Sequence, residues 1–142
     1  MKNKIIFICT GNSCRSQIAE GLFRHEAGDK FEVFSAGSHP SRLHPAAIKV
    51  MAEWGIDIQK QESEKIDKYL NKGINIVITV CDNAKSTCPN FPDGKIITHW
   101  NIKDPFHSWN DNEEDLGPYR MTRNELKEKI KDLLQEDEIK NL

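Results

Sequence analysis

Residues 4–16 read KIIFICTGNSCRS, and this stretch decides the fold. Residues 4–10 form an almost continuous apolar run, which is typical of a parallel strand buried on both faces. Gly11-Asn12-Ser13 is a turn signal, and a helical pattern with one apolar stripe follows from about Arg15 to Ala27. A buried strand that runs through a glycine-containing loop into a helix is typical of an α/β sheet.

Further strands and helices alternate along the rest of the chain. Apolar, β-branched runs predict strands at residues 31–35, 74–80 and 95–98. A helix is expected to begin at Pro45, a residue suited to a first turn, and to end at Gly55. The apolar face of that helix is expected to consist of Ile48, Met51, Ala52 and Trp54.

The last helix is expected to begin at a capping box formed by Thr122 and Glu125. The side of this helix that faces the core is expected to consist of Leu126, Ile130, Leu133 and Leu134. The polar tail after Gln135 is expected to fray. Alternating strands and helices predict an α/β fold. We expect a single three-layer domain over residues 1–142, in which helices flank a four-stranded parallel sheet.

Length and composition exclude several classes of protein. The chain has 142 residues, about one domain, and its formal net charge of -2 argues against a nucleic-acid-binding protein. The sequence contains no apolar run of roughly 18 residues, so no membrane-spanning segment is expected. No small-residue cleavage site follows the apolar run near the N-terminus, so no signal peptide is expected. We therefore expect a cytoplasmic protein.

Four cysteines need an explanation in that reducing compartment: Cys9, Cys14, Cys81 and Cys88. Such cysteines are more often catalytic, redox-active or metal-binding than joined in structural disulfides. A zinc site would need a C-x4-C and a C-x6-C pair, and both spacings are longer than the usual one. It would also leave Arg15 beside the metal without a purpose, so we disfavour a zinc site.

The loop after the first strand has the features of an oxyanion-binding site. Ligands of open α/β sheets bind beyond the carboxyl ends of the strands, where such a loop and the following helix present backbone N–H groups. The same field favours thiolate, so the pKa of Cys9 is expected below its usual range and Cys9 is expected to be the nucleophile. Arg15 can bind two oxygens of the anion at once, and the Ser16 hydroxyl can donate to the thiolate. The predicted anion-binding residues are Thr10, Gly11, Asn12, Ser13, Cys14, Arg15 and Ser16.

Two further segments are expected at the same edge of the sheet. Cys81 directly follows a predicted strand, and neighbouring parallel strands end about 5 Å apart. Asp104-Pro105 follows the last predicted strand, where a carboxylic acid can protonate a leaving oxygen, although the dipeptide alone is more often an ordinary turn. A helix over residues 82–87 would hold Cys81 and Cys88 about 10 Å apart, beyond the roughly 7 Å that a disulfide tolerates. The two cysteines can therefore bond only if this segment loops out.

These residues resemble those of the thioredoxin-coupled arsenate reductases, which share the fold of the low-molecular-weight protein tyrosine phosphatases. The resemblance covers nearly the whole chain and is carried by residues 9–21, Ser35–Gly37, Val80-Cys81, Cys88-Pro89 and Asp104-Pro105. The phosphatases share the loop and the Asp-Pro pair but lack the two cysteines at this spacing. The cysteine pair is therefore the specific signal for a reductase.

The resemblance implies a relay of three cysteines. Cys9 would attack arsenate held by the loop, with Asp104 as the acid that protonates the departing oxygen. Cys81 would then attack the Cys9–arsenic adduct and release arsenite, and Cys88 would move the disulfide to Cys81–Cys88. Thioredoxin is the expected reductant, and a monomer is the expected form. Cys14 has no role in this relay and is expected to be a packed thiol.

The resemblance also bears on metal binding. Some family members bind a potassium ion through positions that match Asn12, Glu20 and Ser35, together with a Thr and an Asp. Glu62 and Glu64 stand at those last two positions here. We therefore assign no firm metal site and expect no obligatory cofactor.

Two alternative functions stay open at this point. The first is a phosphatase that acts through a Cys9 phosphoenzyme, and the aromatic Phe106 after Asp-Pro is more typical of that class. The second is a module that binds oxyanions without catalysis, which would give Cys81 and Cys88 no purpose.

Overall fold

The computed structural model describes residues 2–80 and 90–142, so the predictions for Cys81 and Cys88 lie outside the described residues. The described strands form one parallel sheet in the order β2-β1-β3-β4. They are β1 (Asn3–Cys9), β2 (Phe31–Gly37), β3 (Ile76–Thr79) and β4 (Ile96–His99). The predicted α/β class and four-stranded parallel sheet are confirmed, with strand ends shifted by one or two residues.

β1 lies inside the sheet because both of its edges are paired. It pairs with β2 along its whole length and with β3 from Ile5 to Ile8. Its residues from Ile5 to Cys9 are buried, as expected of a strand covered on both faces. The chain passes from β1 to β2 and then crosses over β1 to form β3, so the strand order reverses at β1. The carboxyl end of β1, at Cys9, is thus where an open α/β sheet binds its ligand.

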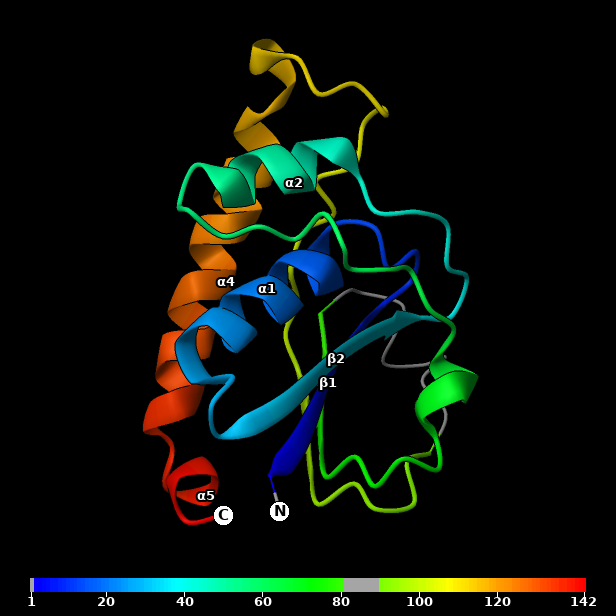
Figure 1. The fold of residues 1–142 in the computed structure, drawn as a ribbon, viewed down its shortest axis with the longest axis vertical. Coiled ribbons are helices and arrows are strands. Elements are labelled where there is room, and N and C mark those ends of the chain that lie inside the picture. Colours follow the sequence, from blue (N-terminus) through cyan, green and yellow to red (C-terminus); the bar gives the residue numbers. More distant parts are fainter. Residues whose placement is uncertain (1, 81–89) are drawn as a thin grey trace.

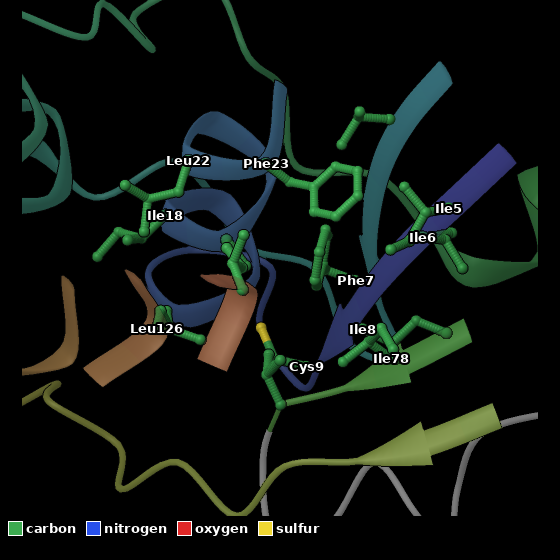
Figure 2. Close-up of a cluster of buried hydrophobic side chains, with 14 of the residues drawn as sticks. Ile5, Ile6, Phe7, Ile8, Cys9, Ile18, Leu22, Phe23, Ile78 and Leu126 are labelled. Carbon is green, nitrogen blue, oxygen red and sulfur yellow. The ribbon is translucent and has the colours of Figure 1, made fainter. Parts of the chain in front are cut away.

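The longer helices gather on one face of this sheet (Figure 1). α1 (Arg15–Ala27) contacts β1 and β2 on one side and α4 (Gly117–Gln135) on the other. Figure 2 shows Phe7 of β1 and Phe23 of α1 facing each other in the core, with their ring centroids 5.7 Å apart. Leu126 reaches the same core from α4. The opposite face is covered by the short 3-10 helix η1 (Ile66–Tyr69), whose Tyr69 ring packs on Phe34 at 5.2 Å.

Helix α4 begins earlier than its predicted capping box. The helix starts at Gly117, with Pro118 in its first turn, so Thr122 is a buried residue inside the helix. The capping-box prediction was wrong because proline, with its fixed φ, starts a helix as readily as a capping side chain does. The predicted fraying of the tail was also wrong: α5 (Asp137–Lys140) follows, and Ile139 is buried against the core.

Helix α2 (Pro45–Ala52) begins where predicted, but its buried face is different. Of the four predicted apolar positions only Met51 is buried, whereas Ala52 is exposed and Ile48 and Trp54 are partly buried. The buried residues are instead Ala46, Ala47, Val50 and Met51. The helix rotates its small residues inward because it packs closely on α1 and α4.

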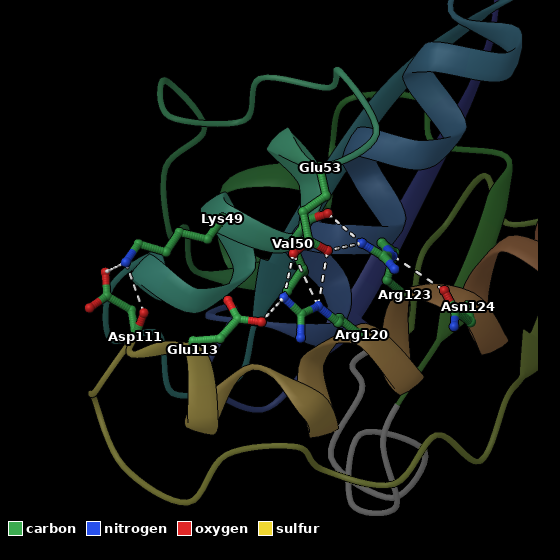
Figure 3. A network of polar contacts seen from close by, with 8 residues as sticks. All are labelled: Lys49, Val50, Glu53, Asp111, Glu113, Arg120, Arg123 and Asn124. Carbon is green, nitrogen blue, oxygen red and sulfur yellow. Dashed lines mark hydrogen bonds and ion pairs between the residues drawn. The ribbon is translucent and has the colours of Figure 1, made fainter.

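A polar cluster fixes the end of α2 to α4 (Figure 3). The Glu53 carboxylate accepts hydrogen bonds from Arg120 at 2.6 Å and from Arg123 at 2.7 Å. Arg123 also donates to the Val50 carbonyl at 2.7 Å. These bonds, that of Arg120 foremost, lower the pKa of Glu53 to about 2. The cluster holds α2 in place, and the other end of α2 supports the candidate site.

Candidate active site

The loop between β1 and α1 turns its carbonyl oxygens outward. Four of them accept backbone hydrogen bonds of 2.9 to 3.3 Å from residues 38–44, namely those of Cys9, Thr10, Gly11 and Ser13. Because the N–H and C=O of a planar peptide point in opposite directions, this arrangement turns the N–H groups toward the loop centre. The Asn12 N–H accordingly donates to Cys9 Sγ at 3.2 Å. The loop therefore has the polarity of an anion-binding site, as predicted.

Two residues give the loop its shape. Asn12 has a left-handed backbone with φ of 49°, a conformation that asparagine tolerates better than most residues, and its Oδ1 accepts from the Glu64 N–H at 2.8 Å. Gly37, at the end of β2, lies against the loop so closely that a Cβ there would come within 2.5 Å of the Thr10 carbonyl oxygen. A side chain at position 37 would therefore push the loop out of place.

The predicted nucleophile lies at the base of this loop. Cys9 is buried, and its Sγ lies 2.8 Å from the Ser16 hydroxyl. Ser16 Oγ also accepts a hydrogen bond of 2.7 Å from the Asn12 side-chain amide. A Cys9 thiolate can only accept, so the Ser16 hydroxyl can donate to it and stabilise the ionised sulfur. The structure thus brings Cys9, Asn12 and Ser16 together as the sequence predicts.

Arg15 connects the loop to the segment that carries Asp104. The Arg15 side chain is buried, and it donates to the Ile102 carbonyl at 2.9 Å. Its second terminal nitrogen lies 3.5 Å from an Asp104 carboxylate oxygen. The Asp104 side chain is 57% exposed, so a leaving oxygen can reach it. The other oxygen of the Asp104 carboxylate accepts from the Phe106 N–H at 3.0 Å. The Asp-Pro segment therefore both forms a turn and exposes a carboxyl group.

Cys14 contributes its backbone to the loop and keeps a protonated thiol. The side chain is buried, and burial raises its pKa above the usual range, with a further rise from the charges of Cys9 and Asp104. A thiol in that state is a poor nucleophile at neutral pH. This environment agrees with the expected packed thiol.

His44, which was not among the predicted site residues, joins α2 to the segment of Asp104. His44 Nδ1 accepts from the Ala46 N–H at 2.9 Å and so caps α2, while Nε2 lies 2.6 Å from the Ser108 carbonyl oxygen. These partners require a neutral ring with its proton on Nε2, and burial lowers the pKa of His44 accordingly. The ring stacks on Trp109 at 4.9 Å. Its position before Pro45, where a cap is expected, was the available sequence signal.

Among the described residues, β3 is the element that connects the second half of the predicted relay to this site. β3 pairs directly with β1, with Ile8 opposite Thr79, which is the neighbour relation that the sequence argument required. Cys81 and Cys88 themselves lie in residues 81–89, outside the described residues. Their distances from Cys9 and from each other stay predictions.

The residues matched to the family's potassium site lie together, but their oxygens are already engaged. Glu20 accepts from the Ser35 hydroxyl at 2.5 Å through one oxygen and pairs with Arg24 through the other. Asn12 Oδ1 is taken by the Glu64 N–H. Over residues 2–80 and 90–142 no group of three or more His, Cys, Asp or Glu could hold a metal ion. The positive charge that lies beside Glu20 in this structure is that of Arg24.

The fold and the loop define the class of protein to which the chain belongs. Residues 4–141 match the model of the low molecular weight phosphotyrosine protein phosphatase family, so the chain belongs to that family. Within it the chain is similar to arsenate reductases: it is 42% identical over 130 residues to the arsenate reductase of Halalkalibacterium halodurans, covering 92% of this chain and 94% of the relative.

Solved structures give the same result. A structure of an arsenate reductase in the oxidized state is 34% identical with a TM-score of 0.79, over 94% of this chain and 97% of that one. A thioredoxin-dependent arsenate reductase from Corynebacterium glutamicum is 27% identical with a TM-score of 0.75, over 94% of this chain and 61% of that one.

Proposed function

We propose that this chain is an arsenate reductase that converts arsenate to arsenite with electrons from its own thiols. The observation that carries the proposal is the loop at the end of β1, where Cys9, Ser16 and Arg15 converge with Asp104. A tetrahedral oxyanion suits the inward N–H groups and the planar guanidinium of that loop. The similarity to arsenate reductases supports arsenate as the anion.

The first step uses residues that the structure describes. The Cys9 thiolate attacks arsenic and forms an As–S bond, while one As–OH bond breaks and that hydroxyl, protonated by Asp104, leaves as water. Arg15 and the loop N–H groups hold the remaining oxygens and balance their negative charge. Arsenic stays in its +5 state in this step, because no electron pair has yet moved onto it.

The following steps need Cys81 and Cys88, whose roles rest on the sequence. The Cys81 thiolate attacks the Cys9 sulfur, an S–S bond forms, and the electron pair of the As–S bond passes to arsenic, which leaves as arsenite in the +3 state. Cys88 then attacks Cys81, so the disulfide becomes Cys81–Cys88 and Cys9 is released as a thiolate. A reduced dithiol restores the pair.

We propose thioredoxin as that dithiol, a monomer as the working form, and the cytoplasm as the compartment. The similarity to a thioredoxin-dependent arsenate reductase supports the reductant. A relay that begins with free thiols needs a reducing compartment, which supports the location.

A coupled assay tests the proposal. NADPH consumption by thioredoxin reductase and thioredoxin should require both this protein and arsenate. It should stop in Cys9→Ser, and Cys88→Ser should complete one turnover and then stall with a Cys9–Cys81 disulfide. Continuous turnover by Cys88→Ser would remove Cys88 from the mechanism.

A phosphatase activity is the second candidate, because its machinery is complete without the cysteine pair. Cys9, Arg15 and Asp104 suffice to transfer a phosphoryl group to a thiolate and to hydrolyse the phosphoenzyme. Hydrolysis of p-nitrophenyl phosphate should therefore survive in Cys88→Ser and disappear in Cys9→Ser. An arsenate-independent phosphatase with no thioredoxin-coupled turnover would replace the reductase proposal.

A further inference from the structure

A chain of hydrogen bonds runs behind the loop, from Cys9 to the surface of α1. Its links join side chains of the loop, of α1 and of β2, and each is 3.0 Å or shorter. In order from the sulfur, the chain consists of Cys9, Ser16, Asn12, Ser35, Glu20 and Arg24. All of its members except Arg24 are buried.

The donor and acceptor roles along this chain of hydrogen bonds follow from two groups that can each act in only one way. The Glu64 N–H can only donate, so the Asn12 atom that it contacts is the amide oxygen and the Asn12 NH2 group faces the chain. The Glu20 carboxylate can only accept, so the Ser35 hydroxyl donates to it and accepts from the Asn12 NH2. The second proton of that NH2 goes to Ser16 at 2.7 Å.

The last link of this chain of hydrogen bonds joins Ser16 to Cys9. Ser16 accepts from Asn12 and keeps its own proton for Cys9 Sγ 2.8 Å away, and it is the donor whenever Cys9 is a thiolate, which can only accept. A hydroxyl that donates to sulfur favours the thiolate, whereas one that accepts from a thiol favours the neutral form. The Glu20 carboxylate thus holds Ser35 as an acceptor for Asn12, and Asn12 in turn holds the Ser16 hydroxyl beside the sulfur.

Arg24 holds that carboxylate in place. Its guanidinium contacts three acceptors from three segments: Glu20 Oε2 at 2.5 Å, the Val33 carbonyl at 2.7 Å and Gln61 Oε1 at 3.2 Å. Glu20 and Arg24 line a cavity of about 420 Å³, and the other charged residues of its lining are Asp57, Lys60, Glu62 and Glu64. Among the described residues of that lining, acidic groups outnumber basic ones, so Glu20 depends on Arg24 for direct neutralisation.

We infer that Arg24 is a positioning residue for the Cys9 nucleophile, acting through the Glu20 carboxylate and the chain that ends in the Ser16 hydroxyl. The inference rests on the proposed role of Cys9 and adds a second, internal source of thiolate stabilisation to the loop N–H groups. The charge that a bound cation would bring to Glu20 is supplied by the side chain of Arg24.

The experiment measures the reactivity of Cys9 without arsenate. The rate of its alkylation by iodoacetamide is followed against pH, and the modified residue is located by mass spectrometry. Arg24→Gln should alkylate about threefold more slowly at pH 7, an effect of the size expected from a half-exposed ion pair, and its profile should move to higher pH. Arg24→Lys should restore much of the rate. Lys30→Gln removes a positive charge from an exposed position that takes no part in the chain of hydrogen bonds, so its alkylation rate should match that of the wild type.

Two further measurements separate positioning from mere structure. Ser35→Ala interrupts the chain of hydrogen bonds without changing the net charge and should also slow alkylation of Cys9. In the second measurement, potassium chloride should raise the unfolding temperature of the wild type no more than sodium chloride does. A reactivity profile unchanged in both Arg24→Gln and Ser35→Ala would overturn the inference, as would an equal shift in Lys30→Gln or a potassium-specific stabilisation. Failure of the coupled arsenate assay with the alkylation result intact would count against the proposed function alone.

Discussion

Replacing His44 should loosen the segment of Asp104 and destabilise the protein by a predictable amount. His44→Ala removes the cap of α2, the bond to the Ser108 carbonyl and the stacking on Trp109. These contacts contribute about 1 kcal/mol for the cap, about 1 kcal/mol for the hydrogen bond and about 1 kcal/mol for the ring contact. The sum of about 3 kcal/mol corresponds to a fall of about 9 °C in Tm for a chain of this length.

Two variants separate these contributions. His44→Asn keeps a side chain that can cap α2 but cannot reach Ser108, so about 2 kcal/mol of the loss should remain. Because the side chain supports the segment of Asp104 and touches no substrate, kcat should fall in both variants while KM for arsenate changes little. Thermal unfolding followed by circular dichroism and the coupled assay provide the two readouts.

The pH dependence gives an independent check. The pKa of His44 is lowered in the folded protein, so folding favours the neutral ring. Its contribution is therefore complete above the unfolded pKa of about 6.5 and is lost as pH falls through the lower folded pKa. Wild-type Tm should fall more steeply than that of His44→Asn below pH 6.5. His107, whose pKa is raised by the Pro105 carbonyl and by Asp115, titrates in both proteins, and its charge adds to the lowering of the His44 pKa. A fall in Tm of less than about 2 °C in His44→Ala, together with parallel pH profiles of Tm for the wild type and His44→Asn, would refute the role assigned to His44.

Four further changes have defined outcomes. Asp104→Asn should lower kcat about 100-fold at unchanged arsenate affinity, as steady-state kinetics and calorimetry can show. Arg15→Lys should raise KM for arsenate at least about tenfold, because an ammonium cannot bind two oxygens in one plane. Gly37→Ala should weaken oxyanion binding in calorimetry, since its Cβ would meet the Thr10 carbonyl at 2.5 Å. Glu53→Gln should cost about 1 kcal/mol at pH 7 after allowance for solvent screening. That difference should persist above pH 4.5 and vanish near pH 2, because the Glu53 pKa is lowered to about 2.

The sheet and the loop could be predicted because local sequence determines both. The buried run of β1 and the helical stripe of α1 are set by periodicity alone, and α1 has the predicted bounds. The meeting of Arg15 with Asp104 followed from a general rule, that parallel strands end at one edge of a sheet.

What the sequence did not reveal depends on contacts between distant segments. The face that α2 buries is chosen by its packing on α1 and α4, which periodicity over eight residues cannot define. The roles of His44 and Arg24 each depend on partners brought in by folding, Ser108 for the first and Val33 and Gln61 for the second. Neither residue differs locally from an ordinary helix cap or an exposed helical arginine.

The relay is tested most directly by counting thiols in a single turnover. Reduced protein is mixed with excess arsenate in the absence of any reductant, free thiols are titrated, and arsenite is measured. The three-cysteine relay predicts one arsenite and the loss of two thiols per chain, with the disulfide located at Cys81–Cys88 by mass spectrometry. An unchanged thiol count of four, or arsenite formation in Cys9→Ser, would contradict it.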